Sequence, residues 1–387
     1  MLVTLDSITT KITKGTTPTS VGCTFENSGV NFIKSESLGN SRNIDRSKFA
    51  FISEQTHEKL KRSQIEKNDI LFSMAGMFLG KTGIVTDDLV PANTNQAVAI
   101  IRIDTEKANH EYVYYYLNQR SVVQAVNASS AQSAQPNINL KQIGQIEIDL
   151  PERKLQDKIV SILSAIDFKI EKNNQINENL AVLLQTVYQE RFGDVDIAAK
   201  QGVLSDICSY SKDRVAVSEL DVTTYFSTEN MLPRKAGSTE ATSLPTTPQT
   251  TACHKGDTLI SNIRPYFKKI VYCEDECGCS TDVLCFTPNQ PQYSAYLFST
   301  LYADKFFAFM VAGAKGTKMP RGDKQQIMTY PIVLPSEVAL VEFNTIALPL
   351  IKQIYSNRAE NKRLSLLRDT LLPKLMSGEL DVSDIDL

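Results

Sequence analysis

Residues 159–187 read IVSILSAIDFKIEKNNQINENLAVLLQTV, an amphipathic stretch near the middle of the chain with neither glycine nor proline. Apolar residues recur in it every three to four positions, which predicts a helix with one buried face. Pro151 suits the first turn of this helix, and Gly193 suits its end. A helix between these signals would run for about 40 residues, or roughly 60 Å. This length favours a helix that pairs with another long helix over the alternative, a core helix of one large α/β domain.

The chain repeats itself at a distance of 184 residues. Shifting residues 136–186 by this distance superimposes identical residues without a gap, which indicates an internal duplication. The matched pairs include Pro136 and Pro320, Ile143 and Ile327, Pro151 and Pro335, Ile170 and Ile354, Asn173 and Asn357, Asn177 and Asn361, and Leu180 and Leu364.

The duplication predicts a globular unit, a helix, a second globular unit and a second helix. We place their boundaries at 1–150, 151–200, 201–334 and 335–387. Upstream of the helices the repeats match more loosely, as NDILFS (68–73) resembles GDTLIS (256–261). Pro349 lies inside the second helical block where the first has Ala165, so we expect the second helix to start late or to kink there.

The two helices are predicted to pair antiparallel through a coiled-coil seam with two positions per heptad. Asn173 and Asn357 would be buried polar positions that fix the register, and changing both to leucine should keep or raise thermal stability. The predicted seam consists of Ile159, Ile162, Ile166, Asn173, Ile176, Leu180 and Leu183 in the first helix, and of Leu350, Asn357, Leu364 and Leu367 in the second.

Composition is typical of a folded protein of two domains. The 387 residues are 42% hydrophobic and 22% charged, which excludes the disordered and fibrous classes. The N-terminus has no apolar run of signal length, and we find no stretch of the roughly 18 apolar residues that a membrane span requires. We therefore expect a cytoplasmic protein without a membrane partner, whose seven cysteines are reduced thiols. The net charge of −3 does not decide whether nucleic acid is bound.

Residues 75–82, AGMFLGKT, fit a relaxed phosphate-loop pattern. A true phosphate loop opens a helix whose N-terminus faces the phosphates. The sequence that follows, GIVTDD, instead favours a short strand and a turn. We predict a hairpin or surface loop here and no nucleotide site.

Cysteines gather in the second unit and raise the alternative of a zinc site. Cys273, Cys277 and Cys279 could supply thiolates, with Cys285 nearby. Their spacing is not a pair of C-x-x-C motifs, and EDECGCSTD (274–282) is typical of a turn between strands, so we predict no metal site. The three histidines stand beside no evident nucleophile, and no methyl-donor motif is found. We predict no catalytic residues and no cofactor bound to this chain.

Polar and basic loops remain as candidates for contact with nucleic acid. Lysine and arginine bind phosphates, whereas hydroxyl and amide side chains can read base edges. The alternative for each residue is an ordinary solvated surface. The candidates are Lys14, Thr16, Thr17, Lys34, Arg42, Ser73, Lys81, Asn95 and Gln96 in the first unit, and Arg264, Lys268, Lys269, Lys315, Lys318 and Arg321 in the second.

These features together resemble the specificity subunits of Type I restriction-modification systems. The resemblance rests on the GTTP turn (15–18), the NDILFS and GDTLIS strands, QPNIN (135–139) before IGQIEIDLP, and the terminal LLPKLMSGEL. It covers essentially the whole chain. It implies an α/β (α+β) fold with two tandem target-recognition domains, separated by two long helices that pair as an antiparallel coiled coil with approximate twofold symmetry.

The resemblance also implies a function. Each recognition domain would read one half of a bipartite double-stranded DNA target, and the chain would perform no chemistry itself. It would recruit two adenine-methylating modification subunits and two motor-nuclease restriction subunits, so that S-adenosylmethionine, ATP and Mg²⁺ belong to the partners. The alternatives are a specificity subunit of a two-component Type II or methylation-only system, and a pseudosymmetric scaffold that binds protein only.

Overall fold

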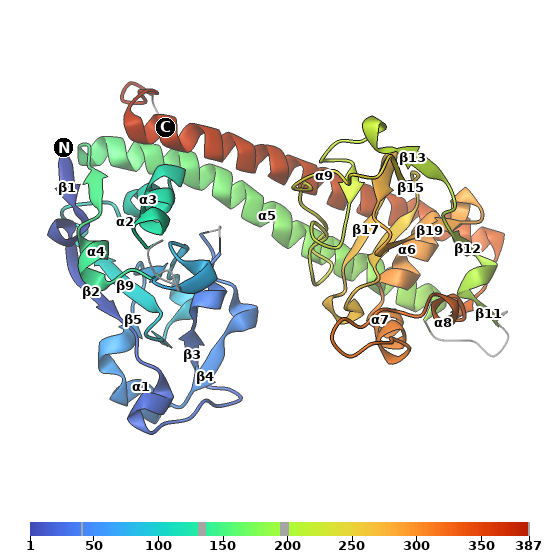
Figure 1. The fold of residues 1–387 in the computed structure, drawn as a ribbon, viewed down its shortest axis with the longest axis horizontal. Helices are drawn as coiled ribbons and strands as arrows, with labels where there is room; N and C mark the ends of the chain where they lie inside the picture. The colour runs from blue at the N-terminus through green and yellow to red at the C-terminus, as the bar shows by residue number, and fades with distance from the viewer. Residues whose placement is uncertain (40–41, 131–136, 194–200, 386–387) are drawn as a thin grey trace. The chain divides into compact units, whose positions relative to one another are not determined.

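The computed structural model describes residues 1–39, 42–130, 137–193 and 201–385. The chain forms two compact units, which we call unit 1 (Met1–Ile170 with Lys362–Leu387) and unit 2 (Glu171–Asn361). Two long helices, α5 (Arg153–Phe192) and α9 (Glu337–Ser377), each run from one unit into the other (Figure 1). Gln135 and Pro136 of the sequence motif, and residues 194–200 of the predicted central spacer, lie outside the described residues.

Unit 1 contains two four-stranded sheets and a strand pair. The first sheet has the order β2 (Thr9–Lys14), β9 (Val98–Ile103), β6 (Ile70–Ser73), β7 (Thr82–Ile84), and the second has the order β4 (Ala50–Ile52), β3 (Val30–Ile33), β8 (Ala92–Thr94), β5 (Gln64–Ile65). Strand β1 (Leu2–Thr4) pairs with β10 (Glu147–Asp149), and the shorter helices are α1 (Glu54–Lys59), α2 (His110–Leu117), α3 (Arg120–Ser130) and α4 (Leu140–Gly144).

Unit 2 has the corresponding parts. Its first sheet has the order β12 (Cys208–Tyr210), β19 (Val283–Pro288), β16 (Thr258–Ser261), β17 (Ile270–Tyr272), and its second the order β13 (Arg214–Ala216), β15 (Gln249–Cys253), β18 (Cys277–Cys279), β14 (Tyr225–Phe226). Strand β11 (Gln201–Val203) pairs with β20 (Pro331–Val333), and the shorter helices are α6 (Ser294–Tyr302), α7 (Asp304–Ala312) and α8 (Lys324–Met328).

The two units repeat one topology. The antiparallel order β2-β9-β6-β7 of unit 1 matches β12-β19-β16-β17 of unit 2. In the second sheets, β3-β8-β5 matches β14-β18-β15, including the parallel pairing of β3 with β8 and of β14 with β18. The remaining strand differs, because β4 lies beside β3 whereas β13 lies beside β15. The predicted duplication therefore extends to strand order, and the units diverge at the sheet edge.

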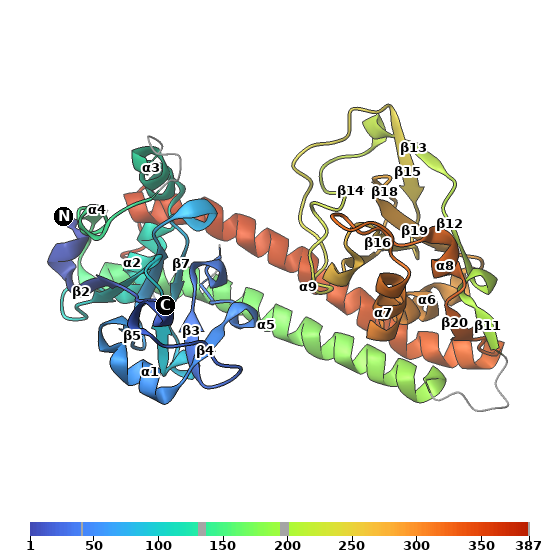
Figure 2. The same ribbon diagram turned by 60° about the horizontal axis from the view of Figure 1, so that its bottom comes forward.

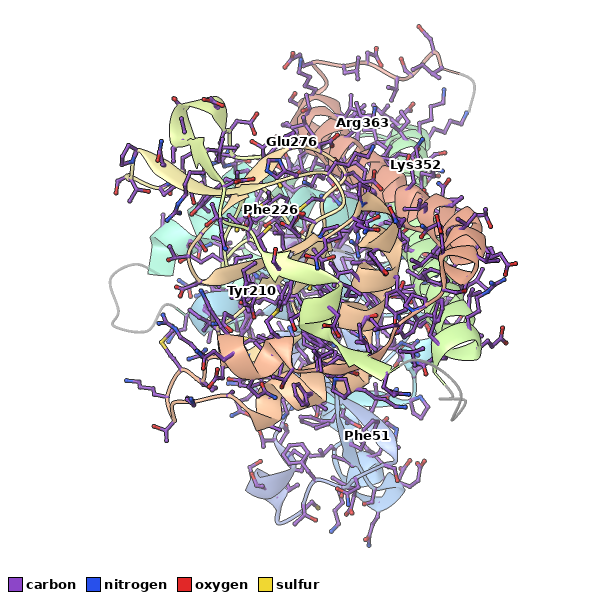
Figure 3. All side chains as sticks on the ribbon, turned by 90° about the vertical axis from the view of Figure 1, so that its right-hand side faces the viewer. Phe51, Tyr210, Phe226, Glu276, Lys352 and Arg363 are labelled. Carbon is purple, nitrogen blue, oxygen red and sulfur yellow. The ribbon has the colours of Figure 1, made fainter. Side chains whose placement is uncertain are left out.

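Alternating side chains set the layers of each unit, because successive residues of a strand point to opposite faces. In unit 1, Ile70 and Phe72 of β6 pack in the cluster that includes the helices, whereas Leu71 packs in the cluster of the second sheet. In unit 2, Ile260 packs with residues of α6 and α7, and Leu259 packs with cysteines of the second sheet. Figure 2 labels α6, α7 and strand β16, from which Ile260 and Leu259 come. Tyr210 and Phe226, labelled in Figure 3, come from these two sheets.

Helices α5 and α9 run antiparallel. In unit 1, Asp167 of α5 pairs with Arg368 of α9 at 2.8 Å. In unit 2, where α5 reaches Arg191, its partner is Glu342 at 2.8 Å. The residue number falls along α9 as it rises along α5, which is the predicted orientation.

Of the two heptad positions predicted to form the seam, one is buried in the structure and the other is not. The position of Ile159, Ile166 and Asn173 is buried. The second heptad position lies one residue later than predicted, because the buried residues are Leu163, Asn177 and Leu184 rather than Ile162, Ile176 and Leu183. Ile176, Leu183 and Leu367 are 43%, 47% and 46% exposed, and Ile162, Leu180, Leu350 and Leu364 are half-buried.

Asparagines form a buried hydrogen-bond network where the helices meet in unit 2. The Asn173 amide donates to Asn361 at 2.9 Å and to Glu360 at 2.8 Å. The Asn357 amide donates to Asn177 at 2.9 Å. Because Asn173 corresponds to Asn357 and Asn177 to Asn361 in the 184-residue repeat, the same asparagine pair occurs twice, once in each direction. Each of these asparagines bonds another, so the structure leads us to expect that removing two of them lowers stability.

The second helix departs from two expectations. It begins at Glu337, before Pro349, so the predicted late start is wrong. Pro349 is exposed, where water can satisfy the carbonyl group that loses its backbone partner. One window of α9 is also long and apolar enough to cross a membrane, by length and composition only, contrary to our expectation. The same helix contributes Leu340, Phe343 and Ala347 to the core of unit 2, as a core helix does.

The asparagine network predicts a stability pattern. Changing Asn173 and Asn357 to leucine should lower the free energy of unfolding by about 1–3 kcal/mol for each buried partner left unsatisfied. Changing Asn177 and Asn361 to leucine as well should recover most of that loss, since the amides that then lose a partner, Gln353 and Asn174, are exposed and can bond to water. Urea unfolding of the full chain measures both, with Asn179→Leu at an exposed position of α5 as the control. A stable double variant would show that the amides are not paired.

Candidate nucleic-acid interface

In unit 1, four chain segments meet at one end of the β2-β9-β6-β7 sheet. They are residues 14–17 after β2, 74–81 between β6 and β7, 95–97 before β9 and 137–138 before α4. Main-chain hydrogen bonds join them, since Met74 N–H donates to Ala97 O at 2.8 Å and Ile138 N–H donates to Met74 O at 3.0 Å. Thr16 N–H donates to Thr94 O at 3.0 Å. We call these four segments the loop end of unit 1.

Gly15 is required for this close approach. A Cβ atom at Gly15 would lie 2.1 Å from the Thr94 carbonyl oxygen and 2.4 Å from that of Asn95, so only glycine fits. The Thr17 hydroxyl then reaches the Gln96 side chain, and the Arg62 guanidinium donates to the Thr16 hydroxyl at 3.2 Å. The GTTP turn is thereby held against the loop before β9.

Unit 2 has an equivalent loop end, formed by residues 211–213, 262–269, 280–282 and 315–322. Asn262 N–H donates to Asp282 O at 2.8 Å, as Met74 does to Ala97 in unit 1. Gly322 N–H donates to Asn262 O at 3.3 Å, as Ile138 does to Met74. The two loop ends therefore share their main-chain connections.

The hairpin loops 74–81 and 262–269 also share a backbone conformation. Gly76 and Gly80 have φ of 69° and 80°, and the residues at the same places of unit 2, Arg264 and Lys268, both have φ of 51°. A short 3₁₀ turn lies between the two positions in each loop. A left-handed conformation costs a non-glycine residue about 1–2 kcal/mol. Unit 2 thus places two cations where unit 1 has unstrained glycines.

Contacts to neighbouring segments hold the hairpin loop of unit 2 in place. Arg234 N–H donates to Phe267 O at 2.7 Å, and Lys235 N–H donates to Lys268 O at 2.9 Å. The side chains of Lys235 and Lys268 both contact Asp304 of α7, at 2.7 and 2.9 Å. Hydrogen bonds from these lysines lower the pKa of Asp304, so the carboxylate stays ionised and the loop stays anchored.

The loop ends bring together most of the predicted contact residues. Lys34 belongs with those of unit 1, because β3 and β8 run parallel with Ile33 opposite Thr94, and both strands leave the sheet at that end. The residues gathered are Lys14, Thr16, Thr17, Lys34, Lys81, Asn95 and Gln96 in unit 1, and Arg264, Lys268, Lys269, Lys315, Lys318 and Arg321 in unit 2.

Two predicted residues are placed elsewhere. The Arg42 guanidinium contacts Glu111 of α2 and is half-buried, so its charge is already neutralised. Ser73 is fully buried in β6, where its hydroxyl cannot reach a base edge. Its predicted role in base reading is therefore wrong, because the alternation of β6 points this side chain into the protein.

Carboxylates already neutralise some cations of unit 2. Lys315 lies 2.5 Å from Asp323, and Arg321 lies 3.0 Å from Asp282. Hydrogen bonding to Lys315 lowers the pKa of Asp323. Lys318 and Arg264 have no ion-pair partner among the residues that the structure describes. These two are therefore the cations of the loop end most available to an anionic ligand.

Sequence reasoning missed Arg62, Arg234 and Lys235, which touch the loop ends. Arg62 contacts Thr16 over 46 residues of sequence, and no local pattern indicates such a contact. Arg234 and Lys235 adopt positive φ within PRKAG (233–237). A proline and a glycine flanking two cations are a turn signal that could have indicated a basic loop.

The other predicted sites have plain outcomes. Residues 75–82 form the turn of the β6–β7 hairpin and run into strand β7 rather than a helix, which confirms the predicted hairpin. Cys277–Cys279 form strand β18 rather than the expected turn. The cysteines in the described residues are free thiols, and within that part no group of side chains has a metal-binding geometry.

One histidine lies between two carboxylates but lacks a nucleophile. His254 contacts Glu276 at 2.6 Å through Nδ1 and Asp213 at 3.1 Å through Nε2. The hydrogen bond with Glu276 raises the pKa of His254, which favours the doubly protonated imidazolium. Such a group is a surface ion pair rather than a general base, because both ring nitrogens are occupied as donors.

Comparisons with known proteins agree on one family. Residues 1–181 match the family model of the Type I restriction modification DNA specificity domain. The chain is 27% identical over 161 residues to the Type I restriction enzyme HindI specificity subunit of Haemophilus influenzae, a match that spans 41% of this chain and only 35% of that subunit. It is 23% identical over 322 residues to the MjaIX specificity subunit of Methanocaldococcus jannaschii, spanning 76% of this chain and 74% of the relative.

The fold is also similar to that of a solved Type I specificity subunit. The crystal structure of a Type I restriction-modification S subunit from M. genitalium superimposes with a TM-score of 0.60 at 16% identity, covering 97% of this chain and 95% of that one. The duplicated units and paired helices fit this fold. Residues 1–181 thus match the specificity domain of Type I systems, and most of the chain is similar to Type I restriction-modification specificity subunits.

Proposed function

We propose that this chain is the non-catalytic DNA-recognition subunit of a Type I restriction-modification complex. It binds a bipartite double-stranded target, one half with each unit, and directs the modification and restriction subunits to that target. One observation carries the proposal: two loop ends share their backbone and their main-chain contacts but present different side chains. A repeated scaffold with different contact residues is what reading two different half-sites requires.

The chemistry belongs to the partners in this proposal. The modification subunits bind S-adenosylmethionine and methylate adenine, and the restriction subunits use ATP and Mg²⁺. This chain recognises the DNA target sequence, and the assembly works in the cytoplasm, where the DNA lies. Absence of a restriction partner would make the system methylation-only without changing the role of this chain.

Helices α5 and α9 are proposed to bind the modification subunits. Val182 and Leu366 occupy equivalent positions of the repeat and are 66% and 70% exposed. Their neighbours Leu183 and Leu367 are also equivalent, at 47% and 46% exposed. Paired apolar side chains with matched exposure, one pair in each unit, fit two copies of one partner. We therefore expect two modification subunits, and two restriction subunits with them.

Removing cations from the unit 2 loop end tests DNA binding. The triple variant Lys315→Ala, Lys318→Ala, Arg321→Ala should weaken binding to target and random duplexes alike. The slope of log K against log salt should fall by about 0.9 for each phosphate that the variant no longer neutralises. Fluorescence anisotropy across a salt series measures this, with Lys352→Ala, Lys362→Ala, Arg363→Ala on α9 as the charge-matched control. An unchanged slope in the loop variant would remove these residues from the interface, and no DNA binding by the wild type would favour a protein-only scaffold.

The partner sites predict a stepwise loss of subunits. Native mass spectrometry of the wild-type chain with excess modification subunit should give two modification subunits per chain. Changing Val182 and Leu183 to aspartate should leave one, and changing Leu366 and Leu367 as well should leave none, because a buried unpaired charge opposes docking. Asn179→Asp is the control. A wild-type complex that stops at one modification subunit would show that the duplication is not used symmetrically.

The proposed lack of catalysis is directly measurable. The purified chain should transfer no methyl group from S-adenosylmethionine and hydrolyse no ATP, with or without DNA, because its AGMFLGKT stretch is a hairpin turn. Methyl transfer should appear when the modification subunit is added. ATP hydrolysis by the isolated chain that disappears in Lys81→Ala would contradict the assignment.

A further inference from the structure

The hairpin loop of unit 2 exposes two aromatic side chains at its tip. Tyr266 and Phe267 are 50% and 39% exposed, and their ring centroids lie 4.8 Å apart. The equivalent tip of unit 1 exposes Met77, at 86%. Large apolar groups at the tip of a polar loop are costly to leave in water, so they point to a ligand with an apolar surface.

The aromatic pair cannot fold back onto the protein without breaking the contacts of the loop. Arg234 N–H bonds the Phe267 carbonyl, and Asp304 holds Lys268. The left-handed conformations of Arg264 and Lys268 fix the turn on both sides of the pair. The tip is therefore preorganised in an outward position.

Cations surround the aromatic pair and define the ligand's charge. Arg264 precedes it, Lys268 and Lys269 follow it, and the carbonyl of Pro320, next to Arg321, accepts from Arg264 N–H at 2.8 Å. Burial lowers the pKa of Lys269. A ligand that offers both anionic groups and flat apolar surfaces is nucleic acid, with its phosphates and its base faces.

We propose that Tyr266, supported by Phe267, is a wedge that enters the DNA duplex and unstacks one base step within the half-site bound by unit 2. This inference rests on the proposed DNA-recognition function. Arg264 and Lys318, which have no ion-pair partner among the described residues, contact the phosphates while the ring replaces the missing stacking partner. Phe78 has the same place in unit 1, but it is half-buried with Lys81 over its ring, so it is less free to act as a wedge.

The wedge predicts which base step the half-site of unit 2 contains. Pyrimidine–purine steps unstack most easily, so the half-site of unit 2 should contain such a step at a position that tolerates no substitution by a stiffer one. This preference would arise without a hydrogen bond to either base. It would appear in the methylome of a host that carries the system.

Fluorescence of 2-aminopurine tests the wedge. The full chain, without partner subunits that could flip bases, is mixed with target duplexes known from methylome sequencing, with 2-aminopurine placed at each purine in turn. The wild type should raise the fluorescence at one step of the unit 2 half-site. Tyr266→Ala should abolish that rise and weaken target binding about tenfold, as expected for loss of one stacked base.

Matched variants separate loss of the wedge from loss of phosphate binding and from removal of an unrelated exposed aromatic ring. Tyr266→Phe should keep the fluorescence change, because the ring remains. Tyr266→Ala should bind random DNA with the wild-type salt slope, because its cations are intact, and Phe168→Ala on α5 should behave as wild type. Target binding without any fluorescence change, or a Tyr266→Ala variant that matches wild type, would overturn the wedge alone. No binding of target DNA by the wild type would overturn the recognition function and the wedge together.

Discussion

The packing of α5 against α9 is the constraint on which both units depend. Each helix supplies core residues to the units, as Leu163 does in unit 1 and Phe343 in unit 2. The repeat places a buried residue of one helix at the position of a buried residue of the other, so one contact pattern is used twice in opposite directions. The paired asparagines give this apolar stripe a polar centre, which sets its register because only one alignment satisfies all the amides.

Duplication then explains how the loop ends can differ while remaining alike. In both units, main-chain hydrogen bonds join the hairpin loop to the segment before the central strand (β9 or β19) and to the segment before the short helix (α4 or α8). None of these bonds depends on side-chain identity. Glycine at 76 and arginine at 264 therefore occupy the same conformation with different chemistry. The scaffold is constrained by backbone geometry, which leaves the side chains at the tip free to vary with the ligand.

Sequence reasoning found the two units, the antiparallel helices and the hairpin at 75–82, because repeats and local turn signals are readable in one dimension. It misplaced half of the helix seam for a physical reason. Ile176 and Leu183 are as apolar as Leu163 and Leu184, and hydrophobicity alone cannot tell a face buried inside the chain from one left exposed. Arg42 and Arg62 show the same limit at the site, since their partners Glu111 and Thr16 are distant in sequence. Ser73 was misjudged because its polar character was weighed above its place in a buried strand.

The composition of unit 1 has a consequence for synthesis on the ribosome. Its core contains Leu5 and Ile8 together with Leu372, Leu375, Met376 and Val382, which are translated only after the whole of unit 2. The sheets of unit 1 can form early, but part of their helical face stays uncovered until α9 has emerged. A chain that terminates early therefore displays apolar surface that proteases and chaperones recognise. A chain that contains α9 also contains unit 2, so the covering of this face by α9 distinguishes chains that carry both units from chains that carry unit 1 alone.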